Sequence, residues 1–323
     1  MHVLSLLSLP LLVAATPLQF SRSRPQASEL APLPLVIWHG LGDDFQRDGL
    51  KTVAALAEKT NPGTYVHLIH LADSGAGDRQ ATFLGNVSEQ VAEVCDQLSS
   101  DRILSTAPAI NALGFSQGGQ FLRGYIERCN SPPVRNLVTF GSQHNGIAEF
   151  QECGWSDWIC RGAEALLRAG RWSQFVQSRF VPAQYFRDPA DLGSYLEHSN
   201  FLADVNNERE SKNETYKENL SRLNRFAMYL FEEDQMVHPK ESAWFGELDA
   251  SSGDVVQLRD REIYKEDWLG LKGLDEQGKL EFKTTPGRHM EISEELLEGV
   301  FKEYFGPIEV DVPVQNSLVK QVY

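Results

Sequence analysis

The sequence is poor in positive charge. Its 323 residues include 30 Lys and Arg against 45 Asp and Glu, a formal net charge of −15 at pH 7. Nucleic acid is therefore a poor partner, because binding to phosphates needs a basic surface. Acidic side chains in excess also keep a protein soluble, so the charge excludes one class of function without indicating another.

Long apolar runs are scarce as well. Residues 3–15 form an apolar stretch that ends in small residues, and Val13 and Ala15 suit cleavage after Ala15. This pattern is typical of a secretory signal peptide, although little positive charge precedes it. The stretch is short for a membrane span, and no later segment has 18 consecutive apolar residues. We expect a signal peptide at 1–15 and a soluble mature protein in a secretory compartment.

Cysteine is limited to four residues, an even number that suits two disulfides in an oxidising compartment. Three pairings are open. One joins Cys153 to Cys160, which are close in a loop-like stretch, and leaves Cys95 for Cys129. Free buried thiols are the alternative. Three N-x-[ST] sequons agree with a secretory route and are candidate N-glycosylation sites: Asn86, Asn213 and Asn219.

Apolar residues make up 41% of the chain, enough for a sizeable core. In the first half, apolar β-rich runs alternate with helical patterns. Strands are expected at 33–40, 65–72, 108–115 and 134–143, and helices at 49–60, 86–100 and 118–129. This alternation predicts a mostly parallel sheet flanked by helices.

The alternation stops between about 144 and 225. This stretch contains helical patterns such as 157–180, aromatic-rich loops and two sequons. We interpret it as a largely helical insertion into the α/β core rather than a separate domain. The alternation resumes with a strand at 225–234.

The C-terminal part predicts a short edge hairpin around 254–258 and a last helix at 293–305 with Ser293 as its N-cap. No repeat and no low-complexity segment interrupts the chain. The resulting division is a signal peptide at 1–15, an irregular tail at 16–31, one α/β domain at 32–306 and a C-terminal tail at 307–323.

Ser116 lies in the pattern G-x-S-x-G at residues 114–118, between an expected strand and an expected helix. This context is the one that a nucleophile elbow requires, because a sharp strand-to-helix turn exposes the hydroxyl and the glycines relieve crowding. The helix that follows also brings free backbone N–H groups to the serine. We predict that Ser116 is a nucleophile. An ordinary glycine-rich turn is the alternative.

A serine nucleophile needs a base, and the base needs an orienting acid. Where such an elbow occurs, the chain order is Ser, then acid, then His. Asp234 stands at the end of the expected strand 225–234 and is the predicted acid. Glu232 and Glu233 compete with it, and a solvated turn carboxylate is the alternative reading.

Four histidines follow the serine: His144, His198, His238 and His289. His289 lies in a loop before the last helix, where the base is expected. His238 is only four residues past Asp234, and His144 precedes the acid. We therefore predict His289 as the base, against the alternative of a surface histidine.

A tetrahedral intermediate also needs an oxyanion hole. The backbone N–H of Gln117, next to the nucleophile, is one predicted donor. The loop after the first apolar strand supplies the other, because Gly40 and Gly42 let the backbone approach the substrate closely. The N–H of Leu41 is the donor expected there, and a simple turn is the alternative.

Five segments then carry a resemblance that reaches beyond the pentapeptide: VIWHGLGDD, ALGFSQGGQFLRGYIERCNSPPVRNLVTFGSQHNG, FLADVNNE, DQMVHPKESAWFG and YKEDWLGLKGLDEQGKLEF. Together they closely resemble the palmitoyl-protein thioesterases, lysosomal enzymes that depalmitoylate proteins. The similarity covers roughly residues 34–305. Many hydrolases share the pentapeptide, whereas GFSQGGQFLR, FLAD and the WFG…LGL block are far more specific.

The resemblance implies an α/β-hydrolase fold and a serine thioesterase that removes long-chain acyl groups, chiefly palmitoyl, from cysteines of S-acylated proteins or peptides. Long-chain acyl-CoA is a further substrate, and no metal or cofactor is implied. By position, the nucleophile, acid and base of the family fall on Ser116, Asp234 and His289. Its disulfides fall on Cys95–Cys129 and Cys153–Cys160.

The sequence departs from the resembled family in one place. Its animal members have a vicinal cysteine pair just after HGMGD, whereas this chain reads HGLGDDFQRDG. That bridge is absent, so the loop is less constrained and a non-animal source is expected. The resemblance also implies a lysosomal or vacuolar location, with secretion as the alternative, and we expect a monomer.

A palmitoyl chain needs a long apolar trough, which we expect the insertion to supply. The candidate lining residues are Ile147, Phe175, Phe180, Val181 and Phe186. For each of them, ordinary core packing is the alternative. Two rival functions also remain: a secreted lipase or carboxylesterase of the same fold that acts on oxygen esters, and an inactive hydrolase-fold protein that only binds its ligand.

Overall fold

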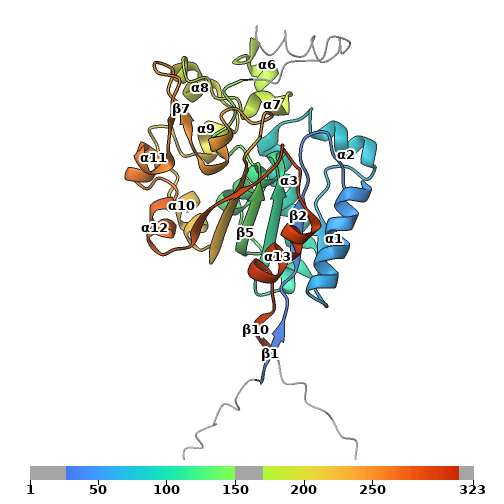
Figure 1. Ribbon diagram of the computed structural model, residues 1–323. Helices are drawn as coiled ribbons and strands as arrows, with labels where there is room; N and C mark the ends of the chain where they lie inside the picture. The colour runs from blue at the N-terminus through green and yellow to red at the C-terminus, as the bar shows by residue number, and fades with distance from the viewer. Residues whose placement is uncertain (1–26, 150–169, 313–323) are drawn as a thin grey trace, which may run out of the picture.

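A six-stranded sheet forms the centre of the molecule (Figure 1). The computed structural model describes residues 27–149 and 170–312. The strand order is β3-β2-β4-β5-β6-β9, and every neighbouring pair is parallel. The strands are β2 (Leu35–Trp38), β3 (Val66–Leu68), β4 (Ile110–Phe115), β5 (Val134–Phe140), β6 (Arg225–Phe231) and β9 (Leu280–Thr285). The predicted parallel sheet is confirmed.

Helices cover both faces of this sheet. One face carries α1 (Asp48–Thr60) and α13 (Glu294–Tyr304), and the other carries α3 (Val87–Ser100), α4 (Gln117–Arg128) and α10 (Glu214–Ser221). Along β2, Val36 and Trp38 join the core under the second face, whereas Leu35 and Ile37 join the core under the first. Strands that are buried on both faces are mostly apolar along their length, and these apolar runs could be recognised as strands in the sequence.

The described part of the segment between β5 and β6 holds α6 (Gln174–Gln177), α7 (Val181–Gln184), α8 (Leu192–His198), α9 (Leu202–Val205) and α10. Of the helical pattern expected at 157–180, residues 157–169 lie outside the described residues. The remainder is not one helix, because Ser173 caps a new short helix and Phe180 pairs with Leu84 as an isolated bridge. In Figure 1, α6, α7 and α8 lie beyond one end of the sheet.

Both chain ends of the domain depart from the expected irregular tails. β1 (Ala27–Ala31) pairs antiparallel with β10 (Ile308–Val312), in a ribbon at the end of the sheet opposite to α6 and α7 (Figure 1). β10 has the alternating apolar and polar residues of a strand, IEVDV, whereas β1 has no such pattern, and each of them pairs with a partner almost a whole chain away. The signal peptide expected at 1–15 lies outside the described residues.

The remaining elements are short. They are α2 (Gly75–Ala81), η1 (Leu104–Thr106), η2 (Lys240–Trp244), β7 (Glu247–Leu248), β8 (Val255–Val256), η3 (Leu258–Asp260), α11 (Glu262–Lys265) and α12 (Leu271–Glu276). The hairpin expected near 254–258 is β8, which pairs with β7 in a separate two-stranded sheet. Ser293 caps α13 by accepting the Leu296 N–H at 3.1 Å, which confirms the predicted N-cap.

A disulfide joins Cys95 in α3 to Cys129 at the end of α4, with 6.1 Å between the two Cα atoms. This bond connects the two helices that cover the same face of the sheet. Cys153 and Cys160 lie outside the described residues. None of the helices in the described part of the chain combines the length and the apolar character that a membrane crossing requires.

Candidate active site

Five loops meet at one edge of the sheet, because the carboxyl ends of parallel strands point the same way. The loops after β2, β4, β5, β6 and β9 begin at His39, Ser116, Gly141, Glu232 and Pro286. Each predicted catalytic residue therefore lies on one of these loops, although the chain separates them by up to 173 positions.

Ser116 occupies a strained turn between β4 and α4. Its φ is 51° and its ψ is −126°, a conformation that residues other than glycine rarely adopt. The Ser116 N–H donates to Phe140 O at 2.8 Å, and Ser116 O accepts the Gly119 N–H at 3.1 Å. These bonds to β5 and to the first turn of α4 hold the serine in this conformation.

The glycines of the pentapeptide are required by close backbone contacts. A Cβ on Gly114 would lie 2.2 Å from Gly119 Cα, and one on Gly118 would lie 2.3 Å from Trp38 O. A Cβ on Gly119 would lie 2.1 Å from Ser142 Oγ. Because distances below 3.0 Å do not occur for real Cβ atoms, larger residues at these positions would push α4 and the serine away from β2 and β5.

Ser116, His289 and Asp234 form a chain of hydrogen bonds. His289 Nε2 lies 3.0 Å from Ser116 Oγ, and His289 Nδ1 lies 2.7 Å from Asp234 Oδ2. The Asp234 side chain is 2% exposed and that of His289 is 12% exposed. Asp234 Oδ1 accepts the backbone N–H groups of Met236 and Val237 at 2.8 and 3.1 Å, which orients the carboxylate.

Asp234, the predicted acid, lies just beyond its strand rather than within it. β6 ends at Phe231, three residues before the predicted end of the strand, and Asp234 is in the turn that follows. Glu232 and Glu233, the competing acids, are exposed. Among these three carboxylates, it is Asp234 whose oxygen contacts the histidine.

Gly141, at the end of β5, is part of the site and was missed in the sequence. Its φ is +56°, and a Cβ there would lie 2.9 Å from His289 Cε1 and 3.0 Å from Phe231 Cε2. The His289 ring also packs near the Phe231 ring, with centroids 5.8 Å apart. Only a glycine leaves room for this imidazole. The available signal was a glycine directly after a buried strand.

The other histidines after the nucleophile have different surroundings. His144 is fully buried, and its ring nitrogens lie 3.3 Å from Arg123 Nε and 3.1 Å from Thr139 Oγ1. Burial, and then the Arg123 charge, hold the pKa of His144 well below its ordinary value, so the ring is neutral. His198 and His238 are exposed at the surface.

The loop after β2 lies close to Ser116. A Cβ on Gly40 would lie 3.1 Å from Ser116 Cβ, which places the Gly40–Leu41 peptide beside the serine. Gln117, on the other side, begins α4, and its side chain is buried against Thr82 O at 3.3 Å and Tyr185 Oη at 3.3 Å. The two predicted oxyanion donors thus lie on segments that flank Ser116.

The five candidate acyl-binding residues do not share one environment. Ile147, Val181 and Phe186 are buried in the large core cluster. Phe180 is half-buried and packs against the small cluster of Val176 and Ala183, whereas Phe175 is 52% exposed. In this structure the first three pack in the core, and the last two lie near or at the surface.

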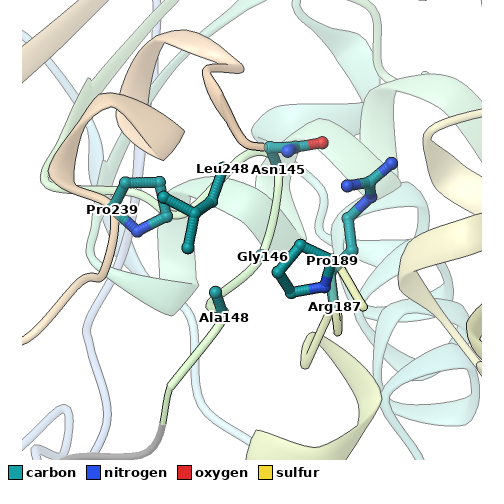
Figure 2. A pocket seen from close by; sticks show the side chains of 7 residues that line it. All are labelled: Asn145, Gly146, Ala148, Arg187, Pro189, Pro239 and Leu248. Atoms are coloured by element: carbon teal, nitrogen blue, oxygen red, sulfur yellow. The ribbon is translucent and has the colours of Figure 1, made fainter. Parts of the chain in front are cut away.

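A small pocket lies beside the catalytic loops (Figure 2). Its empty volume is about 190 Å³, and its lining residues are Asn145, Gly146, Ala148, Arg187, Pro189, Pro239 and Leu248. Figure 2 shows Pro239 and Leu248 on one side and Arg187 and Pro189 on the other. Ligand sites usually measure about 300–1,000 Å³. This pocket is smaller and includes none of the three hydrogen-bonded residues, so we do not assign the acyl chain to it.

A strained serine after a central parallel strand, followed along the chain by an acid and then a histidine, is the arrangement of the α/β-hydrolases, and the chain has this fold. Within that class the chain belongs to the palmitoyl protein thioesterase family, whose model matches residues 34–289. The family resemblance seen in the sequence is confirmed, and the chain is an enzyme of the class that hydrolyses thioesters.

Several curated relatives match along most of the chain. Palmitoyl-protein thioesterase 1 of Caenorhabditis elegans is 38% identical over 297 residues, which cover 91% of this chain and 97% of the relative. Palmitoyl-protein thioesterase 3 of Dictyostelium discoideum is 34% identical and covers 85% and 90%. The lysosomal thioesterase PPT2 homolog of Drosophila melanogaster is 30% identical and covers 80% and 86%.

Solved structures match more distantly. The thioesterase RedJ from the prodiginine biosynthetic pathway of Streptomyces coelicolor has a TM-score of 0.44 and 15% identity, over 88% of this chain and 98% of that chain.

Proposed function

We propose that this chain is a serine thioesterase that removes palmitoyl and other long-chain acyl groups from cysteines of S-acylated proteins or peptides. Family membership supports the substrate class. The observation that carries the mechanism is the hydrogen-bond chain from Ser116 Oγ through His289 to Asp234, beneath a glycine-containing loop. Long-chain acyl-CoA has the same reacting thioester and is a second substrate.

The reaction begins with proton transfer from Ser116 Oγ to His289 Nε2 while Oγ attacks the thioester carbonyl carbon. His289 Nδ1 already donates to Asp234 at 2.7 Å, which keeps Nε2 free to accept a proton. The buried carboxylate then stabilises the imidazolium that forms. The backbone N–H groups of Leu41 and Gln117 stabilise the carbonyl oxygen as it becomes negative.

The tetrahedral intermediate collapses as the carbon–sulfur bond breaks, and the cysteine thiol leaves with the proton from His289 Nε2. A thiolate is a better leaving group than an alkoxide, so this protonation is less demanding than in an oxygen ester. Water then attacks the acyl-serine with His289 again as the base. The fatty acid leaves and Ser116 recovers its proton.

A row of apolar side chains at the surface supports a path for the acyl chain. Leu41, Phe83, Leu84 and Phe175 are all exposed. Contacts link these residues into a row. A Cβ on Gly42, next to Leu41, would lie 3.5 Å from Phe83 Cζ. Leu84 pairs with Phe180, and the rings of Phe180 and Phe175 are 6.4 Å apart. Exposed apolar patches of this kind often bind apolar ligands. Phe175 and Phe180 thus remain acyl-binding candidates.

The first experiment compares hydrolysis of a palmitoyl thioester and a matched palmitoyl oxygen ester by the wild type and by Ser116→Ala. We expect preference for the thioester and loss of activity in the variant. A strong preference for the oxygen ester would move the chain to the lipase or carboxylesterase alternative. A fluorophosphonate probe tests the remaining rival, because an inactive binding protein would not be labelled at Ser116.

The assignment of the acid is tested separately with Asp234→Asn and the matched control Glu233→Gln. An amide at 234 no longer stabilises the imidazolium and favours the wrong tautomer of His289, so kcat should fall by about 10⁴-fold. Glu233 is exposed, and its variant should keep the wild-type kcat. Equal losses in both variants would contradict the role of Asp234.

We also propose a secretory route that ends in a lysosome or vacuole, with secretion as the alternative, and a monomeric enzyme. Relatives whose names include lysosomal thioesterase support the location, as does the apolar sequence at residues 3–15. Cell fractionation with a tagged full-length chain tests it. Co-migration with a cytosolic marker would overturn this route.

A further inference from the structure

A second His–Asp pair lies beneath the loop that covers the nucleophile. His39 Nε2 is 2.9 Å from Asp78 Oδ2, and each side chain is only 1% exposed. His39 is the first residue after β2, and Asp78 lies in α2. Neither residue has a part in the mechanism described above. A buried charged pair at this position therefore needs an explanation of its own.

Both ring nitrogens of His39 face acceptors. Nε2 faces the Asp78 carboxylate, and Nδ1 lies 3.1 Å from Gly40 O. Carbonyl and carboxylate oxygens only accept hydrogen bonds, so both nitrogens must donate and the ring is an imidazolium. Burial alone would lower the pKa of His39, but the hydrogen bond and charge of Asp78 outweigh it, and the pKa is raised. Asp78 correspondingly has a lowered pKa.

The bond to Gly40 O controls the neighbouring N–H. Gly40 C=O and Leu41 N–H belong to one planar trans peptide, in which the two groups point in opposite directions. Holding the carbonyl therefore fixes the direction of the Leu41 N–H. Glycine imposes little preference on this peptide, so without such a bond the peptide could turn over. Gly40 O also accepts the Asp43 N–H, at 3.4 Å, which closes the turn.

Asp78 also holds the rest of the loop 39–45 in place. Its Oδ2 also accepts the Phe45 N–H at 3.0 Å, and its Oδ1 accepts the Leu71 N–H at 2.8 Å. One carboxylate thus joins both ends of the loop 39–45 to the segment after β3. Between these ends, Thr82 Oγ1 accepts the Gly42 N–H at 2.9 Å.

We propose that His39 and Asp78 are positioning residues that hold the Gly40–Leu41 peptide in the orientation in which the Leu41 N–H points at the oxyanion. The pair acts through the backbone of the loop 39–45 and not by contact with the substrate or with Ser116. The inference rests on the proposed function in one respect, that Leu41 N–H is an oxyanion donor.

The test separates the two hydrogen bonds of His39. An Asn side chain places its amide nitrogen near the position of Nδ1 and keeps a donor for Gly40 O. A Gln side chain places it near Nε2 and keeps a donor for Asp78. His39→Gln should lower kcat for the palmitoyl thioester by about 10- to 100-fold with KM within about twofold, because a misdirected donor weakens only transition-state binding. His39→Asn should lose less, and Asp78→Asn, which leaves the His39 ring as a donor to Gly40 O, should resemble His39→Asn.

The matched control is Asn61→Ala. The buried Asn61, which follows α1 and precedes the start of β3, donates from Nδ2 to Phe301 O at 2.9 Å and Phe305 O at 3.2 Å, whereas the loop 39–45 follows the end of β2. Its loss should lower the melting temperature without changing kcat or KM. The inference is overturned if the His39 and Asp78 variants, like Asn61→Ala, lose only melting temperature and keep the wild-type kcat and KM. It is also overturned if His39→Gln retains more activity than His39→Asn.

A second readout keeps this test independent of the substrate proposal. The rate of Ser116 phosphonylation by a fluorophosphonate depends on the same oxyanion donors but not on a palmitoyl group. If the wild type is labelled but does not hydrolyse the thioester, the substrate proposal fails, while a labelling rate about 10- to 100-fold lower in His39→Gln still supports this inference. Unchanged labelling would overturn it.

A third readout needs no substitution and so covers variants that do not fold. In wild-type protein with ¹⁵N-labelled histidine, both ring nitrogens of His39 should carry protons at neutral pH. If the spectrum shows that Nδ1 is unprotonated, His39 cannot donate to Gly40 O, and the inference is overturned.

Discussion

Ser116 carries a left-handed backbone conformation that its neighbours hold in place. Residues in such conformations cost about 1–3 kcal/mol each. The bond from the Ser116 N–H to Phe140 O and the start of α4 offset that strain, while three glycines let the surrounding backbones approach. The turn itself could be predicted from the sequence, because a glycine stands two positions before the serine and another two positions after it.

The role of Gly141, in contrast to the turn at Ser116, was not predicted from the sequence. Gly141→Ala should lower kcat by about 10²-fold, because the new Cβ would lie 2.9 Å from His289 Cε1 and displace the imidazole from Ser116. The measurement is kcat with palmitoyl thioester, corrected for active enzyme. Gly253→Ala is the matched control, since Gly253 also has a positive φ, +75°, but a Cβ there would meet no other atom within 4 Å. Equal losses in both would contradict contact with His289 as the cause.

At the scale of elements, the helices expected in the first half of the chain were predicted well, and one of the two edge strands of the sheet was missed. The patterns at 49–60, 86–100 and 118–129 match α1, α3 and α4 to within a residue or two. α1 and α3 bury one apolar face, and a period of 3.6 residues records that burial locally, whereas α4 is buried at every position except Arg128. β9, at one edge of the sheet, was not predicted, whereas β3, at the other edge, was expected at 65–72 and lies at Val66–Leu68.

The sequons illustrate how an element decides which side chains are accessible. Asn219 lies in α10, is only 8% exposed, and donates from Nδ2 to Glu127 O at 3.1 Å. Asn213, the N-cap of the same helix, is exposed. In the secreted form we expect a glycan on Asn213 and none on Asn219. Peptide mapping after glycosidase treatment checks this, and a glycan on Asn219 would contradict it.

The disulfide between α3 and α4 gives a second prediction at this scale. Its cysteines are 34 positions apart, so replacing both Cys95 and Cys129 by Ser should lower the free energy of unfolding by about 3–4 kcal/mol. Urea unfolding under non-reducing conditions measures the effect, with the wild type after reduction as the control. A change below about 1 kcal/mol would show that the bridge constrains the unfolded chain little.

At the scale of the whole molecule, parallel topology determines where chemistry can occur. Five strand ends of one sheet bring together Ser116, His289, Asp234, Gly141 and the loop after β2. The described part of the insertion packs into the core on one face through Tyr195, Phe201 and Leu202. The hydrolase fold therefore supplies the arrangement, and the residues on its loops supply the activity.

The buried His39–Asp78 pair makes the stability of the whole fold depend on pH. The pKa of His39 is raised above 6.5, so its contribution is complete below pH 6.5 and is lost as the pH rises through the folded-state value. The pKa of Asp78 is lowered below 3.8, so its contribution is present above pH 3.8 and is lost as the pH falls through its folded-state value. Asp43 adds a smaller negative field that also raises the pKa of His39.

Because the folded-state pKa of His39 lies above 6.5, we expect the stabilising contribution of this pair to be smaller at about pH 9 than at about pH 6. Asp78→Asn should show a smaller fall over this range, because it lacks the charge that raises this pKa. Urea unfolding at both pH values measures the difference. An equal fall in both proteins would assign the pH dependence to other groups.

The sequence by itself determined the strands buried on both faces, the helices α1, α3, α4 and α13, the turn at Ser116 and the order of Ser116, Asp234 and His289 along the chain. Each of these is encoded in residues that are neighbours along the chain, as apolar periodicity or as glycines around a turn. That Ser116, Asp234 and His289 lie within reach of one another was inferred from that order and from the family resemblance.

Only the tertiary structure decided which distant residues touch. It brought β1 to β10, buried Asn219 under Glu127 O, and set Gly141 against the ring of His289. It also paired His39 with Asp78, 39 positions away. Such contacts depend on how complete elements pack, and no local pattern records them, because the residues involved meet only after the sheet and its helices have assembled.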